Sequence, residues 1–373
     1  YYRPAIFLRT ASYLLFAFAT GWALYRIVAF RPPPSSDPAL SKLIGNFRRT
    51  LPLPTRPADV LIRQAQKQLS DDRLDELDGA IRSLEQALMV DPSSVDALGF
   101  LAEAYGLVAP LRNDPHPFVT ALDVADLFQR LYPQRADGWI AKARIALSGQ
   151  NFSLARSASE EALRKDPDNE RALLVRARVL LTLSHDRASL EQVIGLASRA
   201  LARNSSWLEG YDLIGQALFL KNEPRLAMET HEQRLQQAPN DAQSLYRMGS
   251  IQERGNNFSN AKEWYQEALR SNANFVPARV RLALIYDRID SRSDLAEHHL
   301  RLVLGRYAKY AQPADHSTAS RELIHILIRS KRGKEALDIS RNLPAPPSGS
   351  SDFVISQAHA VEAGGDDSSA LNL

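Results

Sequence analysis

The chain contains no cysteine, and this absence removes several kinds of chemistry. Disulfide bonds, thiolate metal sites and thiol nucleophiles are all excluded. The sequence also has no HExxH motif and no glycine-rich phosphate loop. His298 and His299 are adjacent and diverge by about 100° on a helix, so they do not form a metal pair. We therefore expect no enzymatic activity, no cofactor and no metal.

A strong excess of charge of either sign is also absent. The chain has 46 Lys and Arg against 43 Asp and Glu, a formal charge of +3, with no long basic run. This mixture lacks the electrostatic pattern of a nucleic-acid-binding protein, so we expect no nucleic acid partner. Of the 373 residues 45% are hydrophobic and 24% charged, which is typical of folded protein rather than a disordered chain.

Long hydrophobic runs are scarce, and the one that matters lies near the N-terminus. Thr10 to Tyr25 contains 16 residues without a charge, which as a helix is roughly 24 Å long, short of a hydrocarbon core of about 30 Å. A helix from Ala5 to Phe30 would be long enough if Arg9 and Arg26 extend to the two interfaces. The aromatic residues suited to the membrane interfaces are Tyr13, Trp22 and Tyr25.

These features predict a transmembrane helix within residues 1–30 and a single-pass membrane protein, of the bacterial inner membrane. A cleavable signal peptide and a buried soluble helix remain alternatives. More lysines and arginines follow the span than precede it, which favours a cytoplasmic side for the rest of the chain, but we leave the side open. Residues 31–57 are rich in proline and predict an extended linker.

Beyond Pro57 the sequence repeats. Alanine-rich stretches end at regular intervals, at Pro92, Pro133, Pro167, Ser205, Pro239 and Ala273. The residue numbers of successive end points differ by 41, 34, 38, 34 and 34. Within a unit, a bulky residue is followed four positions later by a small one, as in Tyr211 and Gly215. Two helices can pack closely only where such small side chains lie at their crossing, so each unit predicts a pair of antiparallel helices.

The pattern resembles the tetratricopeptide repeat family, whose units are 34-residue helix-turn-helix pairs. The segment Asp137 to Pro167 carries Trp139, Ala143, Ala155 and the closing Asp166-Pro167 pair. The resemblance implies an all-α, right-handed superhelical solenoid of about eight to nine units over residues 58–373. The last unit would be incomplete, since Ala358 and Ala370 fit the pattern of a ninth.

Two units are longer than the family's period. The second has seven extra residues around Gly106 to Phe118, and the fourth has four around Ser184 to Arg187. Each insertion predicts either a longer turn or a loop that contacts a partner.

The resemblance also implies that the first helix of each unit lines a concave groove that binds extended or helical segments of other proteins. The candidate groove residues are Arg144, Arg178, Phe219, Tyr246, Arg247, Arg281, Arg288 and Arg321. Because arginine pairs with carboxylates in a bidentate way, we expect an acidic partner segment. The alternative is a solvated face of mixed charge.

Three functions remain open at this stage. The first is a membrane-anchored scaffold or adaptor that binds and organises partner proteins. The second is a structural accessory subunit whose transmembrane helix packs within a larger membrane complex. The third is the regulatory part of an enzyme whose catalytic domain lies beyond Leu373.

Overall fold

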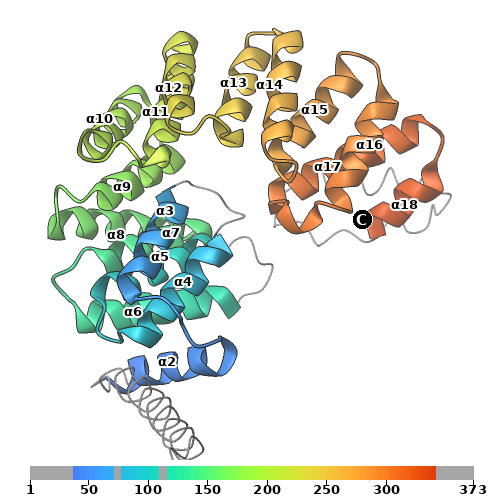
Figure 1. Cartoon of the computed structure of the whole chain (residues 1–373). Helices are drawn as coiled ribbons and strands as arrows, with labels where there is room; N and C mark the ends of the chain where they lie inside the picture. Colours follow the sequence, from blue (N-terminus) through green and yellow to red (C-terminus); the bar gives the residue numbers. More distant parts are fainter. Residues whose placement is uncertain (1–36, 71–76, 109–115, 342–373) are drawn as a thin grey trace, which may run out of the picture. The chain divides into compact units, whose positions relative to one another are not determined.

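Every regular element of the described residues is a helix (Figure 1). The structure, a computed structural model, describes residues 37–70, 77–108 and 116–341. In these ranges it has seventeen α-helices, α2 to α18, and one short 3-10 helix, η2. The chain divides into two compact units, Tyr1–Val179 and Leu180–Leu373, and the boundary falls within α9.

The first unit is built from helices that pack on their neighbours in sequence. They are α2 (Pro38–Thr50), α3 (Ala58–Ser70), α4 (Leu77–Val90), α5 (Val95–Val108), α6 (His116–Leu131), α7 (Asp137–Ser148), α8 (Phe152–Lys165) and the first part of α9 (Glu170–Leu183). α3 packs on α4, α5 on α6 and α7 on α8; α5 also contacts α3 and α4, and α7 contacts α5 and α6. Their buried leucine, isoleucine and alanine side chains form a continuous core from α2 to α7.

The second unit repeats the same arrangement. Its helices are α10 (Arg187–Arg203), α11 (Leu208–Leu220), α12 (Pro224–Gln237), α13 (Ala242–Arg254), α14 (Phe258–Ser271), α15 (Val276–Arg288), α16 (Ser293–Leu304), η2 (Ala308–Tyr310), α17 (Pro313–Arg329) and α18 (Gly333–Arg341). We call the first helix of each pair the A helix and the second the B helix. In this unit α11, α13, α15 and α17 are A helices, packed on α12, α14, α16 and α18.

Small residues lie where the two helices of a pair cross. A Cβ atom added to Gly215 of α11 would lie 2.4 Å from the ring of His231 on α12. A Cβ atom on Gly249 of α13 would lie 2.6 Å from the ring of Tyr265 on α14. The prediction of close helix pairs from the spacing of small residues is therefore confirmed at these crossings.

The turn between A and B helices has one recurring backbone shape. The second residue after the A helix has a positive φ at Gln150, Asn222, Asn256 and Lys331; after α15 the residue with a positive φ is the third, Ser291, and the N–H of Arg292 donates to Tyr286. At Asn222 the backbone N–H donates to Phe219, and the next N–H, of Glu223, donates to Leu218 at 2.9 Å. These bonds satisfy carbonyl groups that the end of a helix leaves without partners.

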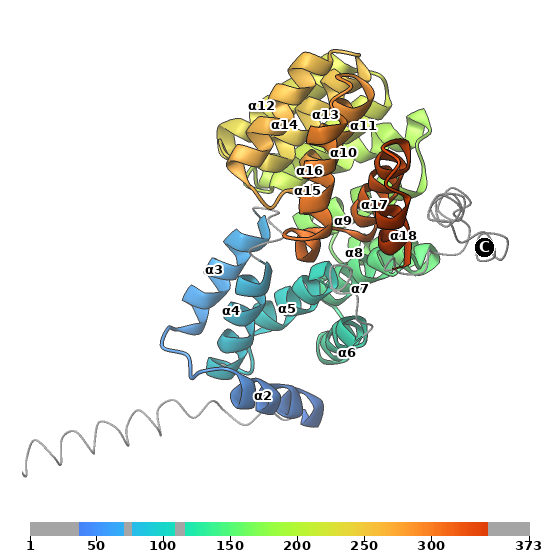
Figure 2. The same cartoon turned by 90° about the vertical axis from the view of Figure 1, so that its right-hand side faces the viewer.

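The predicted linker is wrong for residues 38–50, which form helix α2. Asp37 caps this helix by accepting from the N–H groups of Ala39 and Leu40, and proline at its first position suits a helix start. The side chains buried against the first unit are Leu40, Ile44 and Phe47. Their spacing is that of one helix face. Figure 2 shows α2 crossing beneath α4, which it contacts.

The two predicted insertions have different outcomes. Around Ser184 the turn has only three residues, Ser184 to Asp186, as at Gly149 to Asn151. The extra residues instead lengthen the B helix α10 to 17 residues, against 14 in α8, α12 and α14. For this insertion, the predictions of a longer turn and of a partner-contacting loop are therefore both wrong. Most of the first insertion, residues 109–115, and the predicted ninth unit lie outside the described residues.

Candidate partner-binding face

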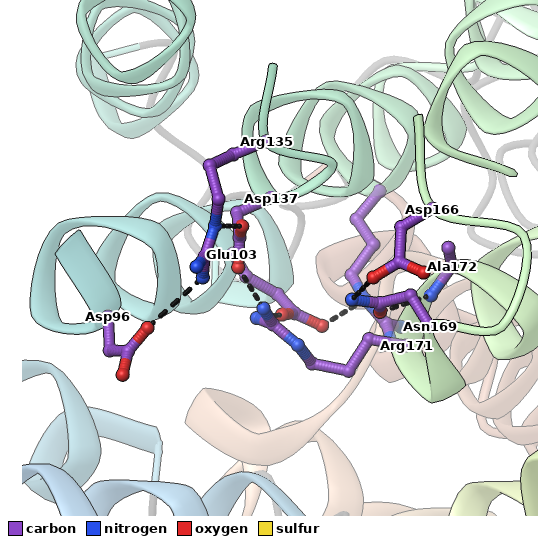
Figure 3. A network of polar contacts seen from close by, with 9 residues as sticks. Asp96, Glu103, Arg135, Asp137, Asp166, Asn169, Arg171 and Ala172 are labelled. Carbon is purple, nitrogen blue, oxygen red and sulfur yellow. Dashed lines mark hydrogen bonds and ion pairs between the residues drawn. The ribbon is translucent and has the colours of Figure 1, made fainter. Parts of the chain in front are cut away.

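A network of buried charges joins three A helices of the first unit (Figure 3). Arg171 of α9 donates from Nη1 to Oε2 of Glu103 on α5 at 2.7 Å, and from Nη2 to Asp137 on α7. Arg144 of α7 donates from Nε to the other oxygen of Glu103 at 2.7 Å. At the rim, Arg135 donates to Asp137 at 2.9 Å. The Arg171 guanidinium also lies over the ring of Phe100, 4.1 Å from its centroid.

Each buried charge in this network has an opposite charge beside it. Burial raises the pKa of Asp137, but the positive charges of Arg171 and Arg135 lower it by more. The pKa of Asp137 therefore lies below its usual value. Burial likewise opposes the charge of Arg171, but Glu103 and Asp137 raise its pKa overall. The network is therefore a structural link between repeats. Arg144, a predicted groove residue, is only 8% exposed and belongs to this link.

Arginine–carboxylate pairs also connect successive A helices in the second unit. Arg247 of α13 donates to Asp212 of α11 at 2.9 Å. Arg281 of α15 donates from Nε to Glu253 of α13 at 3.0 Å. Arg288 of α15 donates to Glu322 of α17 at 2.8 Å. Three of the predicted arginines, Arg247, Arg281 and Arg288, thus pair with carboxylates of a neighbouring A helix.

The last residue of each of three successive A helices is an arginine. Arg254 ends α13, Arg288 ends α15 and Arg329 ends α17, and all three are exposed. Arg254 donates to the carbonyl of Phe219 at 3.3 Å and lies 4.7 Å from its ring centroid. Arg329 donates to Asp287 of α15 at 2.6 Å. Their own contacts hold each of these guanidinium groups at the end of its A helix, and we call the three residues the arginine row.

Two aromatic side chains lie among these charges. Tyr246 of α13 is half-buried, with its ring centroid 5.7 Å from that of Tyr265 and 5.6 Å from that of Phe275. Phe219 of α11 is half-buried beneath Arg254. Both therefore offer part of an apolar ring to solvent.

Of the other predicted groove residues, Arg178 on α9 is half-buried and has an interaction of its own. Arg321 on α17 donates to Glu322 at 3.4 Å, so Glu322 accepts from both Arg321 and Arg288.

The comparison with known families agrees with this architecture. Profiles of the tetratricopeptide repeat match residues 140–192 and 242–275, and the second segment coincides with the pair α13 and α14. The chain therefore contains tetratricopeptide repeats in these two segments. No curated protein matches it in sequence.

Solved structures share the tetratricopeptide solenoid at low identity. The human IFIT1 dimer with PPP-AAAA has a TM-score of 0.60 and 14% identity over 89% of this chain and 75% of its own. The APC/C hetero-tetramer Cut9-Hcn1 has a TM-score of 0.57 and 14% identity over 84% of this chain, which spans 54% of that one. Yeast Tom70 has a TM-score of 0.55 and 16% identity over 83% of this chain and 64% of its own. At these identities the likeness establishes the fold alone.

Arg254 was not among the predicted groove residues. It lies one repeat period before Arg288, so the repeat frame could have identified it. The carboxylate partners of Arg247, Arg281 and Arg288 were harder to predict, because each belongs to a different repeat from its arginine.

The remaining predictions concern the membrane and metals. None of the helices in residues 37–70, 77–108 and 116–341 is long and apolar enough to cross a membrane. The predicted span and its aromatic residues Tyr13, Trp22 and Tyr25 lie outside these ranges. The described part of the chain also has no group of three or more His, Asp or Glu side chains placed to hold a metal ion.

Proposed function

We propose that this protein is a membrane-anchored scaffold that binds an acidic segment of a partner protein along the A helices of its second unit. The observation that carries the proposal is the arginine row of Arg254, Arg288 and Arg329. Its members come from three successive repeats, which is how a solenoid presents one extended binding surface. The anchor rests on the apolar stretch within residues 1–30.

The charges of this surface favour a partner that carries carboxylates. The carboxylates of Asp287 and Glu322 accept hydrogen bonds from three arginines, Arg288, Arg321 and Arg329. One positive charge is therefore left over in this cluster. A partner carboxylate can add to it with bidentate geometry, because each guanidinium has five N–H donors.

Apolar contacts next to the charges supply further affinity. Arg254 has no carboxylate partner among the described residues and covers the ring of Phe219. A partner segment that displaces solvent from Phe219 and Tyr246 would gain aromatic contacts of the kind that dominate protein interfaces. The expected partner is thus an extended segment with both acidic and apolar side chains.

The proposal is tested by crosslinking the full-length protein, extracted from its membrane, and mapping the crosslinks by mass spectrometry. We expect crosslinks from α13, α15 and α17 to soluble proteins. The variant Arg254→Glu/Arg288→Glu/Arg329→Glu should lose them. The matched control, Arg225→Glu/Arg270→Glu/Arg301→Glu, reverses three exposed charges on B helices and should keep them.

Two results would contradict the proposal. Equal capture by both triple variants would remove the arginine row from the binding surface. Crosslinks mainly from the predicted span to a constant set of membrane proteins would instead identify a structural subunit. Circular dichroism of both variants checks that the helices remain folded.

A further inference from the structure

Helix α2 has a cationic outward face. Its exposed basic residues are Lys42, Arg48 and Arg49, and its sequence contains no acidic residue. Lys42 and Arg49 are seven residues apart, about two helical turns, so they lie on one line along the helix, and Arg48 is turned by about 100° from this line to the border of the buried side. The opposite side of the helix is buried against the first unit. The cationic face is therefore held in place by the packing of the apolar one.

These three cations differ from most arginines of the chain in having no carboxylate partner among the described residues. Exposed arginines elsewhere, such as Arg164 and Arg270, pair with a glutamate three residues before them. The acidic residue next to α2 is Asp37, which caps the helix and accepts from Arg130 at 3.2 Å. The positive charge of the outward face is thus not neutralised within the described part of the molecule.

An exposed apolar side chain follows directly after the helix. Leu53 is 81% exposed, the largest value among the exposed hydrophobic side chains of the described residues. Arg56, also exposed, lies three residues further on. Cations combined with an exposed leucine suit the surface of an anionic bilayer, where phosphate groups meet the basic residues and acyl chains meet the apolar one. A nucleic acid would attract the same cations but would leave Leu53 in water.

We propose that the outward face of α2, together with Leu53, binds the anionic phospholipid headgroups of a membrane. This contact does not depend on a transmembrane span. If a span is present, it brings the face close to the bilayer, and binding then becomes intramolecular. The start of the solenoid would in either case lie against the membrane surface.

The absence of cysteine makes the test specific. Asn46 is exposed on α2, so Asn46→Cys in the full-length chain gives a single site for a fluorescent donor. The chain is placed in nanodiscs of phosphatidylcholine alone, or of a two-to-one mixture with phosphatidylglycerol, each with an acceptor-labelled lipid. We expect energy transfer to rise with phosphatidylglycerol and to fall as salt is added.

Three variants then separate the contributions. Lys42→Gln/Arg48→Gln/Arg49→Gln should weaken the contact on the order of 100-fold, because each cation contributes about a fivefold effect. Leu53→Asn should weaken it about tenfold through lost apolar burial. Arg187→Gln/Arg225→Gln/Arg270→Gln removes the same net charge from B helices and should leave the contact unchanged.

The outcomes distinguish this proposal from the proposed anchor. If the chain does not enter phosphatidylcholine nanodiscs, the anchor is refuted, and the same variants are compared by adding vesicles of the two compositions. Energy transfer that does not change with the phosphatidylglycerol content would overturn the lipid-binding face. An equal reduction of energy transfer in both triple variants would overturn it as well. Displacement of the vesicles by a short RNA duplex, with Leu53→Asn having no effect, would assign the face to nucleic acid instead.

Discussion

At the scale of single residues, the turns between A and B helices keep non-glycine residues in the left-handed region. The φ angles at Gln150, Asn222, Asn256, Ser291 and Lys331 lie between 56° and 63°. This conformation costs an L-residue about 1–2 kcal/mol, and asparagine tolerates it best. Gln150, Ser291 and Lys331 lack this tolerance.

We expect Lys331→Gly to stabilise the last described repeat by about 0.5–1 kcal/mol, because the relief of strain exceeds the extra backbone entropy of glycine. Lys334→Gly, within helix α18, is the matched control and should destabilise by about 1 kcal/mol. Urea unfolding followed by circular dichroism measures both. An equal loss of unfolding free energy in Lys331→Gly and Lys334→Gly would show that the turn is not strained at Lys331.

His231 makes stability depend on pH. It is 1% exposed beneath Gly215, and burial lowers its pKa to about 4. Asp212 and Asp241 favour its protonation, whereas Arg247 and Arg234 oppose it. The unfolded chain binds a proton near pH 6.5 and the folded chain only near pH 4, so stability is complete above pH 6.5 and falls as the pH drops toward 4.

We expect this loss to reach about 3 kcal/mol at and below pH 4, at 1.36 kcal/mol per pKa unit. His231→Gln should flatten the dependence of the unfolding free energy on pH between 6.5 and 4.5. The control His298→Gln, at an exposed position, should leave this pH dependence unchanged. His299 has a pKa lowered to about 4 by burial and by Arg279, so a smaller slope remains in the His231 variant. An unchanged slope in His231→Gln would contradict the prediction.

At the scale of elements, the crossing of two helices limits side-chain size. In Gly249→Ala the new methyl group would lie 2.6 Å from the Tyr265 ring. We expect a loss of about 1–3 kcal/mol, although alanine favours helices. Gly195→Ala, in α10, has no heavy atom within 4 Å of its new methyl group and should gain about 1 kcal/mol. Thermal unfolding compares the two, and a gain in both would show that the crossing adapts without strain.

The same scale shows what the sequence could predict. Helices that begin at Glu170, Leu208, Ala242 and Val276 each start three residues after one of the predicted end points, because the small residues at helix crossings recur with the period of the repeat. Helix α2 was missed because the prolines around it outweighed the helical spacing of its apolar residues. The repeat spacing predicted Arg247, Arg281 and Arg288, but their carboxylate partners lie 28 to 35 residues away on other repeats, and no local sequence pattern indicates such a pair.

At the scale of the whole molecule, a solenoid transmits a defect only from neighbour to neighbour. Glu103 accepts from both Arg144 and Arg171 and is 3% exposed. Glu103→Gln would leave two buried arginines with less opposite charge, and breaking a buried pair in this way costs about 3–5 kcal/mol. We expect this loss to be confined to the repeats that contact α5.

Hydrogen exchange measured by mass spectrometry tests this localisation. Amides of α5, α7 and the first part of α9 should exchange faster in Glu103→Gln, while those of α13 to α16 should keep their rates. Glu267→Gln, which removes an exposed pair with Arg270 on α14, should change no region by more than about 0.5 kcal/mol. Faster exchange throughout the chain would instead mean that the two units unfold as one cooperative body, and the buried network would then stabilise the whole array rather than its first repeats.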